Sequence, residues 1–421
     1  MVKEKLKKIT AREVLDSRGN PALEVTAYST NDCASAIVPS GASTGIYEAL
    51  ELRDNDKRYH GKGLKKAIKN VEFISKKLIK ENINISNIKK IDNFMIKLDG
   101  TVKKTKLGAN SILGISMAMC RLACKIEKKP LYLFLANLYN NKKLYMPIPF
   151  CNVINGGEHA GNKLAMQEFM IVPIKTKSFS NAAQMISETY YELKLIIKKK
   201  YGKNAVNVGD EGGFAPPITK AEEALELIKK AIKNSNYEGK IKIALDPAAS
   251  EFYKRSKKKY LLHKYYNDLQ LKEYYLKLAK KYDIISIEDP FDQDDFEAFT
   301  KITKDAKFQI VGDDLLVTSK DRIKIAIEKK LCNALLLKIN QIGTITQAMD
   351  AAKLAMDKKW KVMVSHRSGE TEDTFISDLA VALGCGQIKL GAPCRGERTA
   401  KYNQLIRIEE ELLKKVKLKK F

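Results

Sequence analysis

Three acidic and three basic side chains stand at the ends of short apolar runs in the second half of the sequence. In chain order they are Asp246, Glu288, Asp313, Lys338, His366 and Lys389. The steps between them are 42, 25, 25, 28 and 23 residues, and the shorter steps are about one strand plus one helix. Parallel strands of a β/α barrel end on one face, so these side chains are expected to share a site. Their types predict a metal site that faces a set of cationic groups.

The three acids are the group that we expect to bind the metal. Hard divalent cations such as Mg²⁺ prefer oxygen ligands, and carboxylates from three strand ends would converge on one ion. Acids at strand ends are also common as loop caps, which is the alternative. Asp289 and Asp314 are acidic neighbours of this group. Strand alternation alone does not tell which member of each pair points inward.

Lys338 ends the apolar run ALLLKIN and is a candidate general base. Burial and nearby cations disfavour an ammonium group, so we expect a lowered pKa at this position. The alternative is a lysine whose stem crosses apolar surface while its charge reaches solvent. Apolar residues on both sides of Lys338 favour the buried position.

Two glutamates stand in segments of unusual composition. Glu211 lies in GDEGG, where paired glycines permit a tight turn or a close backbone approach, and the alternative is an ordinary acidic loop. Gln167 and Glu168 are a polar interruption in an apolar strand, MQEFMIVP. If Glu168 and Glu211 share a site, their repulsion raises one pKa and keeps a proton available.

Further polar groups indicate an anion-binding site. His159 follows a glycine pair, and His366, Arg367 and Ser368 are consecutive, as a clamp for phosphate or carboxylate would require. The segment SGASTG, residues 40–45, offers hydroxyl and N–H groups for an anion or a metal, or is an ordinary flexible turn. The sequence has no GxxxxGK[ST] motif for a nucleotide phosphate.

The elements that must position these residues fall into two parts. Residues 1–140 predict short strands joined by a DSRGNP turn and then several helices, which make a small α+β domain. A stretch rich in Asn, Lys and Pro marks the boundary. Residues 141–421 alternate strands and helices almost to the end, and we expect an α/β barrel. The fold class is therefore α/β, with a small N-terminal α+β domain before the barrel.

Composition limits the function classes. The 421 residues include 76 Lys and Arg against 50 Asp and Glu, a net charge of +26. The lysines are spread over most predicted helices, so we expect no dedicated nucleic-acid surface, only weak electrostatic attraction of polyanions. Seven scattered cysteines without metal spacing indicate reduced thiols. No signal peptide or membrane span is predicted, and we expect a cytoplasmic protein.

Many segments, in family order, resemble the enolase family. They include VPSGASTGIYEALELRD, KLGANSILG, INGGEHAGN, GDEGGFAP, SIEDPF, LLLKINQIGT and SHRSGETEDTF. The resemblance covers nearly the whole chain. It implies glycolytic dehydration of 2-phosphoglycerate to phosphoenolpyruvate, in a reversible reaction. It also implies a modified eight-stranded α/β barrel, a homodimer, and two Mg²⁺ per active site, the second arriving with substrate.

The resemblance also implies roles for single residues. Asp246, Glu288 and Asp313 would hold the first Mg²⁺, and Ser43 would help to hold the second. Lys338 would remove the α-proton, and Glu211 would assist loss of the hydroxyl group. The expected catalytic residues are Glu211, Lys338, Glu168 and His366. The expected substrate-binding residues are His159, Gln167, Glu168, Arg367, Ser368 and Lys389.

Several positions depart from the family pattern, among them PALEV, QIKLGAP, RGER and LDPAASEF, and none of them removes a catalytic group. Two alternatives remain open. The chain could dehydrate another carboxylate on the same scaffold, which the phosphate-directed set around Arg367 disfavours. It could also have a secondary role in binding polyanions or RNA assemblies, which the charge of +26 would serve.

Overall fold

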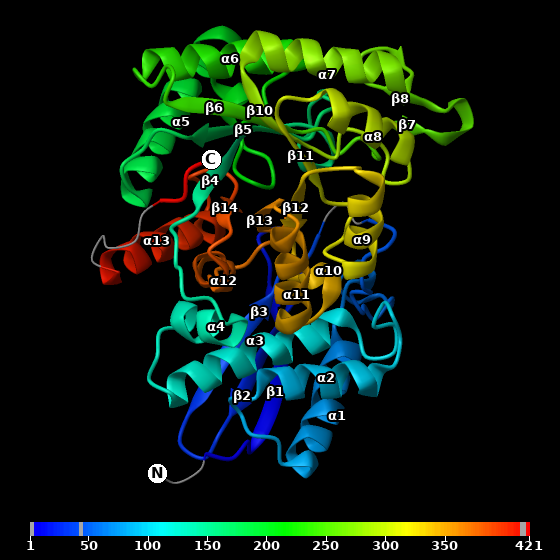
Figure 1. Ribbon diagram of the computed structural model, residues 1–421, viewed down its shortest axis with the longest axis vertical. Coiled ribbons are helices and arrows are strands. Elements are labelled where there is room, and N and C mark those ends of the chain that lie inside the picture. Colours follow the sequence, from blue (N-terminus) through cyan, green and yellow to red (C-terminus); the bar gives the residue numbers. More distant parts are fainter. Residues whose placement is uncertain (1–3, 42–44, 413–417) are drawn as a thin grey trace.

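The computed structural model describes residues 4–41, 45–412 and 418–421. A small domain of one sheet and several helices lies at the bottom of Figure 1, and a barrel surrounded by helices lies above it. The predicted fold class, a small N-terminal domain followed by an α/β barrel, is confirmed. The boundary between residues 140 and 141 stays a prediction.

The N-terminal sheet contains three antiparallel strands, β1 (Lys8–Leu15), β2 (Pro21–Tyr28) and β3 (Cys33–Val38). The turn between β1 and β2 is the predicted DSRGNP segment. Its first residue, Asp16, accepts hydrogen bonds through Oδ1 from the N–H groups of Arg18 and Asn20, both at 2.8 Å. An aspartate that bonds its own turn in this way favours a tight reversal of the chain.

Four helices complete the N-terminal domain: α1 (Lys65–Glu81), α2 (Ile88–Asp99), α3 (Ala109–Ile126) and α4 (Leu131–Tyr139). Helix α3 is almost entirely buried and packs against β2 and β3. The contact is close because α3 has a glycine there: a Cβ atom on Gly114 would lie 2.5 Å from Cγ2 of Val25. This helix joins the sheet to the barrel.

The barrel is closed by eight strands. They are β4 (Ile148–Asn155), β5 (Glu168–Pro173), β6 (Ile241–Asp246), β10 (Ile284–Glu288), β11 (Gln309–Gly312), β12 (Ala334–Leu337), β13 (Lys361–Ser365) and β14 (Gly386–Lys389). All neighbouring pairs are parallel except those of β5, which runs antiparallel to β4 and β6. A separate core of apolar strand side chains fills the barrel, including Phe150, Met170, Leu336 and Met363.

The strands are surrounded by an outer layer of helices (Figure 1). These are α5 (Phe179–Tyr201), α6 (Ala221–Asn234), α7 (Asp268–Tyr282), α8 (Phe296–Asp305), α9 (Lys320–Lys329), α11 (Ile345–Asp357), α12 (Phe375–Leu383) and α13 (Gly396–Glu411). A short helix, α10 (Ile339–Ile342), follows β12. A small sheet, β7 (Tyr253–Lys254), β8 (Lys259–Leu261) and β9 (Tyr265–Tyr266), precedes α7. Short 3-10 turns lie at Arg58–Gly61, Gly157–His159, Lys203–Val206 and Arg255–Lys257.

The two domains meet at the start of α11. Asp92 of α2 accepts hydrogen bonds through Oδ2 from N and Oγ1 of Thr346, at 3.1 and 2.8 Å. The N–H of Ile345 donates to Oγ of Ser116 in α3, at 3.1 Å. These two side chains of the N-terminal domain accept hydrogen bonds from the first turn of α11. The backbone N–H groups of a first turn have no partners within their own helix.

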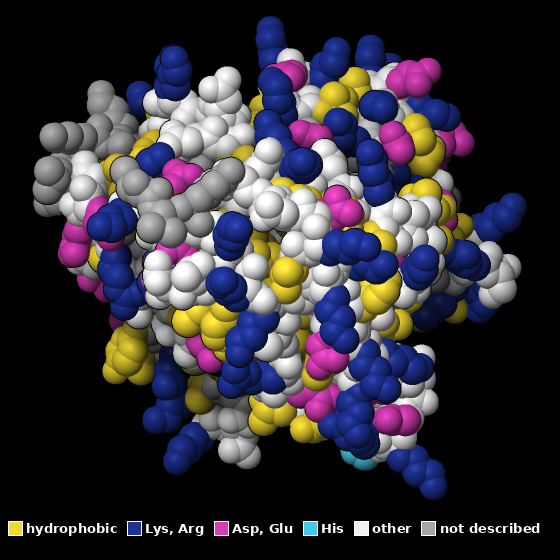
Figure 2. Space-filling view, turned by 90° about the horizontal axis from the view of Figure 1, so that it is seen from below, with side chains coloured by type: hydrophobic (Ala, Val, Ile, Leu, Met, Phe, Trp, Pro, Cys, Tyr) yellow, Lys and Arg dark blue, Asp and Glu magenta, His cyan; other side chains and the backbone are white. Residues whose placement is uncertain are grey.

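The positive charge is spread over the surface. Figure 2 shows lysine and arginine side chains distributed across one face, among acidic and apolar side chains and without a single basic patch. This distribution agrees with the lysines spread along the sequence. None of the helices in the described parts of the chain has the length and apolar character that crossing a membrane requires.

Candidate active site

The barrel strands bring the predicted ionisable residues to one end. Strands β6, β10 and β14 end at Asp246, Glu288 and Lys389. The other three predicted residues each come one position after a strand: Asp313 after β11, Lys338 after β12 and His366 after β13. All these strands are parallel neighbours in the barrel, so their ends share one face, as the spacing predicts.

Glu168 reaches the same face by a different route. It is the first residue of β5 and pairs with Asp246 at the end of β6 and with Asn155 at the end of β4. Because β5 is antiparallel, its N-terminal end lies where its neighbours end. The prediction of a polar interruption within a strand was wrong, since the strand begins at Glu168.

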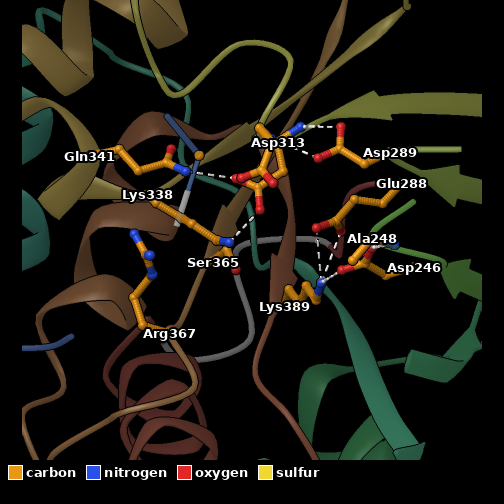
Figure 3. Close-up of polar contacts among 12 residues, drawn as sticks. Asp246, Ala248, Glu288, Asp289, Asp313, Lys338, Gln341, Ser365, Arg367 and Lys389 are labelled. Atoms are coloured by element: carbon orange, nitrogen blue, oxygen red, sulfur yellow. Dashed lines mark hydrogen bonds and ion pairs between the residues drawn. The ribbon is translucent and has the colours of Figure 1, made fainter. Parts of the chain in front are cut away.

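Lys389 is the centre of one ionic cluster (Figure 3). Its ammonium nitrogen lies 2.9 Å from carboxylate oxygens of Asp246 and Glu288, as drawn in the figure. It lies equally close to Oε2 of Glu168, and the lysine side chain is 2% exposed. Burial alone lowers the pKa of an ammonium group, but these carboxylates raise the pKa of Lys389 well above its ordinary value. The lysine is therefore charged and holds three strand ends together.

Lys338 forms a second ion pair, with Oδ2 of Asp313 (Figure 3). The other oxygen of Asp313 accepts a hydrogen bond from Nε2 of Gln341, at 2.8 Å. Burial lowers the pKa of Lys338, yet the attraction of Asp313 outweighs it and the net shift is upward. The sequence-based expectation of a lowered pKa was wrong for this state, because it considered burial and cations but not the partner carboxylate.

Asp289 has different partners from its acidic neighbour Glu288. The carboxylate of Asp289 accepts hydrogen bonds from the backbone N–H groups of Asp313 and Asp314, at 3.0 and 2.7 Å. Its pKa is raised to about 8 by burial and by the charge of Asp313. Asp289 thus braces the end of β11, whereas Glu288 and Asp313 face the lysines.

Two groups of three side chains in the described part of the chain place their ligand atoms within 4.8 Å of one another. One is Asp289, Asp313 and Asp314, and the other is His159, Glu168 and Glu211. The predicted trio of Asp246, Glu288 and Asp313 is not such a group. Its carboxylates pair instead with the ammonium groups of Lys338 and Lys389. The concentration of buried oxygen donors fits a site for a divalent cation.

Glu211 and Glu168 both lie close to one nitrogen of the His159 imidazole. Nδ1 of His159 is 3.6 Å from Oε1 of Glu211 and 3.7 Å from Oε1 of Glu168. Asn152 of β4 donates to Oε2 of Glu211, at 3.0 Å. Burial and the charge of Glu211 raise the pKa of Glu168 well above its ordinary value. Burial raises the pKa of Glu211 too, but His366 and His159 outweigh it and hold that pKa well below its ordinary value, so the pKa values of the two glutamates move apart.

The glycine-rich turn around Glu211 has the geometry that its sequence suggests. Gly212 has a φ of +82°, a backbone angle that residues other than glycine rarely adopt. A Cβ atom on Gly213 would lie 2.6 Å from Oδ1 of Asn155, so only glycine fits this approach to β4. The turn presses against the strand end and directs Glu211 into the barrel mouth.

His366 is neutral and has a defined tautomer. Burial lowers its pKa to about 3. Nη1 of Arg398 lies 2.6 Å from Nδ1 of His366, and arginine only donates. Nδ1 is thus the acceptor and Nε2 carries the hydrogen, 3.4 Å from Oε2 of Glu211. Sequence reasoning missed Arg398, although it lies in the segment RGER that departs from the family pattern.

Arg367 and Ser368 stand at the other side of the mouth. Both Nη atoms of Arg367 donate to the carboxylate of Glu48, and Nη1 also donates to Oδ1 of Asn340. The carbonyl of Ser368 accepts from Nη2 of Arg398, at 2.6 Å. Sequence reasoning missed Glu48, because no local pattern indicates its contact with the barrel.

A small cavity joins these groups. It is lined by His159, Gln167, Glu168, Glu211, Lys338, Ser365, His366, Arg367, Ser368 and Lys389. All predicted substrate-binding residues and all predicted catalytic residues are among them. The predicted metal ligands lie just beyond it, in contact with Lys338 and Lys389. Ser43 lies outside the described residues.

Two family models match the chain. The model for the N-terminal domain of enolase matches residues 6–135. The model for the C-terminal TIM barrel domain of enolase matches residues 143–420. Together they cover the small domain and the barrel, in that order.

Proposed function

The chain belongs to the enolase family, and from this premise we propose that it catalyses the reversible dehydration of 2-phosphoglycerate to phosphoenolpyruvate, a step of glycolysis. One observation carries the proposal. A candidate base, Lys338, and a carboxyl group with a raised pKa, Glu168, line the same buried cavity as the cationic side chains of Arg367 and Lys389. A base, an acid and anion-binding groups are what removal of water from a phosphorylated carboxylate requires.

The donor set fits the metal that the family implies. Asp246, Glu288 and Asp313 offer buried carboxylate oxygens, and the pKa of Glu288 is raised well above its ordinary value by burial and by the charge of Asp246. Crowded carboxylates of this kind favour a divalent cation. We propose that these three hold one Mg²⁺ and that Ser43 takes part in holding a second that arrives with substrate. When bound, Mg²⁺ supplies positive charge that stabilises the additional charge developing on the substrate carboxylate.

Lys338 is proposed to remove the α-proton. In the structure it is paired with Asp313, and its raised pKa keeps it protonated. It can act as a base only when Asp313 has another cationic partner. Burial then lowers the pKa of the amine, as the sequence analysis expected. The same carboxylate is a proposed metal ligand, so metal binding and activation of the base are linked.

The carboxyl groups in the cavity, Glu168 and Glu211, are proposed to assist departure of the hydroxyl group by supplying a proton. The pKa of Glu168 is raised, which favours a bound proton there, and both Glu168 and Glu211 lie within 3.7 Å of Nδ1 of His159. The pKa of Glu211 is lowered well below its ordinary value, so Glu211 would first take up a proton and then pass it to the leaving oxygen. Oε1 of Gln167 and Nδ1 of His159 are buried and have no hydrogen-bond partner among the described residues. Polar atoms in that state favour a polar ligand.

The experiment is direct. Purified protein with Mg²⁺ should convert 2-phosphoglycerate into a product with enol absorbance in the ultraviolet, and EDTA should abolish the reaction. Lys338→Ala and Glu211→Gln should each lower turnover by a factor on the order of 10² or more. Lys353→Ala is the matched control, because Lys353 is exposed and pairs with Asp357 of the same helix, α11. Full turnover in Lys338→Ala would refute the assignment of the base.

A comparison of substrates separates the proposal from dehydration of another carboxylate. Arg367 and Lys389 place cationic groups at the cavity, so the phosphorylated glycerate should react and unphosphorylated glycerate should not. Preference for the unphosphorylated acid would favour another reaction of the same scaffold.

The family likeness also supports a homodimer and a cytoplasmic location as proposals. Sedimentation of the purified protein at micromolar concentration should give about twice the chain mass of 47.5 kDa. Fractionation of the source cells should recover the activity in the cytosol.

A further inference from the structure

A segment of the N-terminal domain lies against the mouth of the barrel. The N–H of Ile46 donates to Oε1 of Gln293, at 3.1 Å. The N–H of Ala49 donates to the carbonyl of Gln341, at 2.9 Å. Glu48 is between these anchors, so its backbone is fixed beside the cavity.

The carboxylate of Glu48 holds Arg367 by two hydrogen bonds. Nη1 lies 2.9 Å from Oε2 and Nη2 lies 3.2 Å from Oε1, and the side chains of Arg367 and Glu48 are 3% and 9% exposed. Asn340 of the barrel accepts from Nη1 as well, at 2.9 Å. Two acceptors from two domains therefore fix the plane of the guanidinium. That plane decides which edge of Arg367 can meet an anionic ligand.

The same carboxylate also reaches the acidic side of the site. Nε2 of Gln341 lies 3.3 Å from Oε1 of Glu48 and 2.8 Å from Oδ1 of Asp313. Carboxylates only accept, so the amide nitrogen faces both acids, and Oγ1 of Thr318 donates to the amide oxygen at 2.9 Å. One amide thus connects Glu48 to the carboxylate that pairs with Lys338. Figure 3 shows the part of this chain that runs from Gln341 through Asp313 to Lys338.

We propose that Glu48 is a positioning residue that holds Arg367 in the orientation in which it binds the substrate phosphate, so that the N-terminal domain completes the active site. The inference rests on the proposed function and adds a residue to it. A bidentate pair fixes the direction of an arginine, and a fixed donor loses less freedom when it binds an anion. Glu48 itself does not touch the reacting atoms.

Kinetics gives the first test. Glu48→Gln should raise the KM for 2-phosphoglycerate by about tenfold, the effect of weakening one charged hydrogen bond, with a smaller change in kcat. Glu48→Asp keeps the charge and should restore most of the affinity. The matched control is Glu13→Gln, which weakens an equivalent pair with Arg58 inside the N-terminal domain. Unchanged KM in Glu48→Gln, or an equal rise in Glu13→Gln, would overturn the proposal.

A double-mutant cycle gives the second test and does not depend on turnover. Calorimetric binding of inorganic phosphate at fixed ionic strength should weaken about tenfold in Glu48→Gln. In an Arg367→Ala background the same change should have less than about a twofold effect, because Glu48 then has no arginine to orient. Equal losses of phosphate affinity in both backgrounds would overturn the inference. Tighter phosphate binding in Glu48→Gln would also overturn it, since the carboxylate of Glu48 would then compete with the anion for Arg367. If 2-phosphoglycerate is not turned over but this cycle holds, the proposed function fails and the coupling of Glu48 to Arg367 stands.

Discussion

Asp92 is a buried carboxyl group at the contact between the two domains, and its replacement by asparagine tests how burial controls stability. It is fully buried in α2 and accepts two hydrogen bonds from Thr346 at the start of α11. Burial raises its pKa from the ordinary value of 3.8 to about 6, because the hydrogen bonds compensate only in part. The folded protein therefore holds this proton more tightly than the unfolded chain does.

The direction of the pH effect follows from that difference. Protonation of Asp92 contributes its full stability below about pH 4, where both states carry the proton. The contribution decreases as the pH rises to about 6, and above that it stays lost. A shift of about two pKa units corresponds to about 3 kcal/mol at pH 7, since one unit is about 1.4 kcal/mol. Asparagine is neutral at every pH and does not have this dependence.

The assay is urea denaturation of wild type and Asp92→Asn between pH 4 and pH 8. The difference in unfolding free energy should move by about 3 kcal/mol in favour of the variant from pH 4 to pH 7. The amide also changes the unfolding free energy by an amount that does not vary with pH. That amount depends on how the amide fits near Oδ1 of Asp92, which has no hydrogen-bond partner among the described residues. Asp350→Asn, at an exposed position of α11, is the control. A difference between Asp92→Asn and wild type that does not change with pH would refute the reasoning.

Three further outcomes are expected. Gly114→Ala should lower the unfolding free energy by about 1–3 kcal/mol, because the new Cβ would lie 2.5 Å from Val25, and a thermal melt that matches wild type would contradict the close packing of α3 on the sheet. In D₂O, Lys338→Ala should no longer exchange the α-hydrogen of 2-phosphoglycerate, whereas Glu211→Gln should retain exchange while dehydration is lost; equal exchange in both would contradict the separate roles of base and acid. Removal of divalent cations by EDTA should lower the melting temperature and Mg²⁺ should restore it, as binding to the folded state requires, and no change would argue against the proposed carboxylate site.

The positions of the strand ends could be predicted from the sequence because two local signals agree there. A short apolar run predicts a buried strand, and an ionisable residue that ends it needs charged or polar partners there. Asp246, Glu288 and Lys389 are the last residues of their strands, and Lys338 directly follows the last residue of β12. The repeat length then indicated a barrel, which placed these ends on one face.

Other features depend on which strands are neighbours, and the local pattern does not contain that information. Glu168 lies at the mouth because β5 is antiparallel, and an apolar run such as FMIVP does not reveal the direction in which its strand runs. The raised pKa of Lys338 comes from Asp313, 25 residues earlier in the sequence. The pair of Glu48 and Arg367 joins residues 319 positions apart. The roles of all these residues stay predictions until the variants are measured.

The charges in the barrel mouth explain why these contacts matter together. Lys389 is one cation among three carboxylates, and burial makes the remaining negative charge costly, as the raised pKa values of Glu288 and Glu168 indicate. Protons compensate part of that charge, and a divalent cation would compensate more of it. A chain selected for stability alone would not gather buried carboxylates in this way, because apolar side chains of similar size would be at least as stable. This arrangement is the one expected of the proposed site for a cation and an anionic substrate, in which the carboxylate of Glu48 from the other domain holds Arg367.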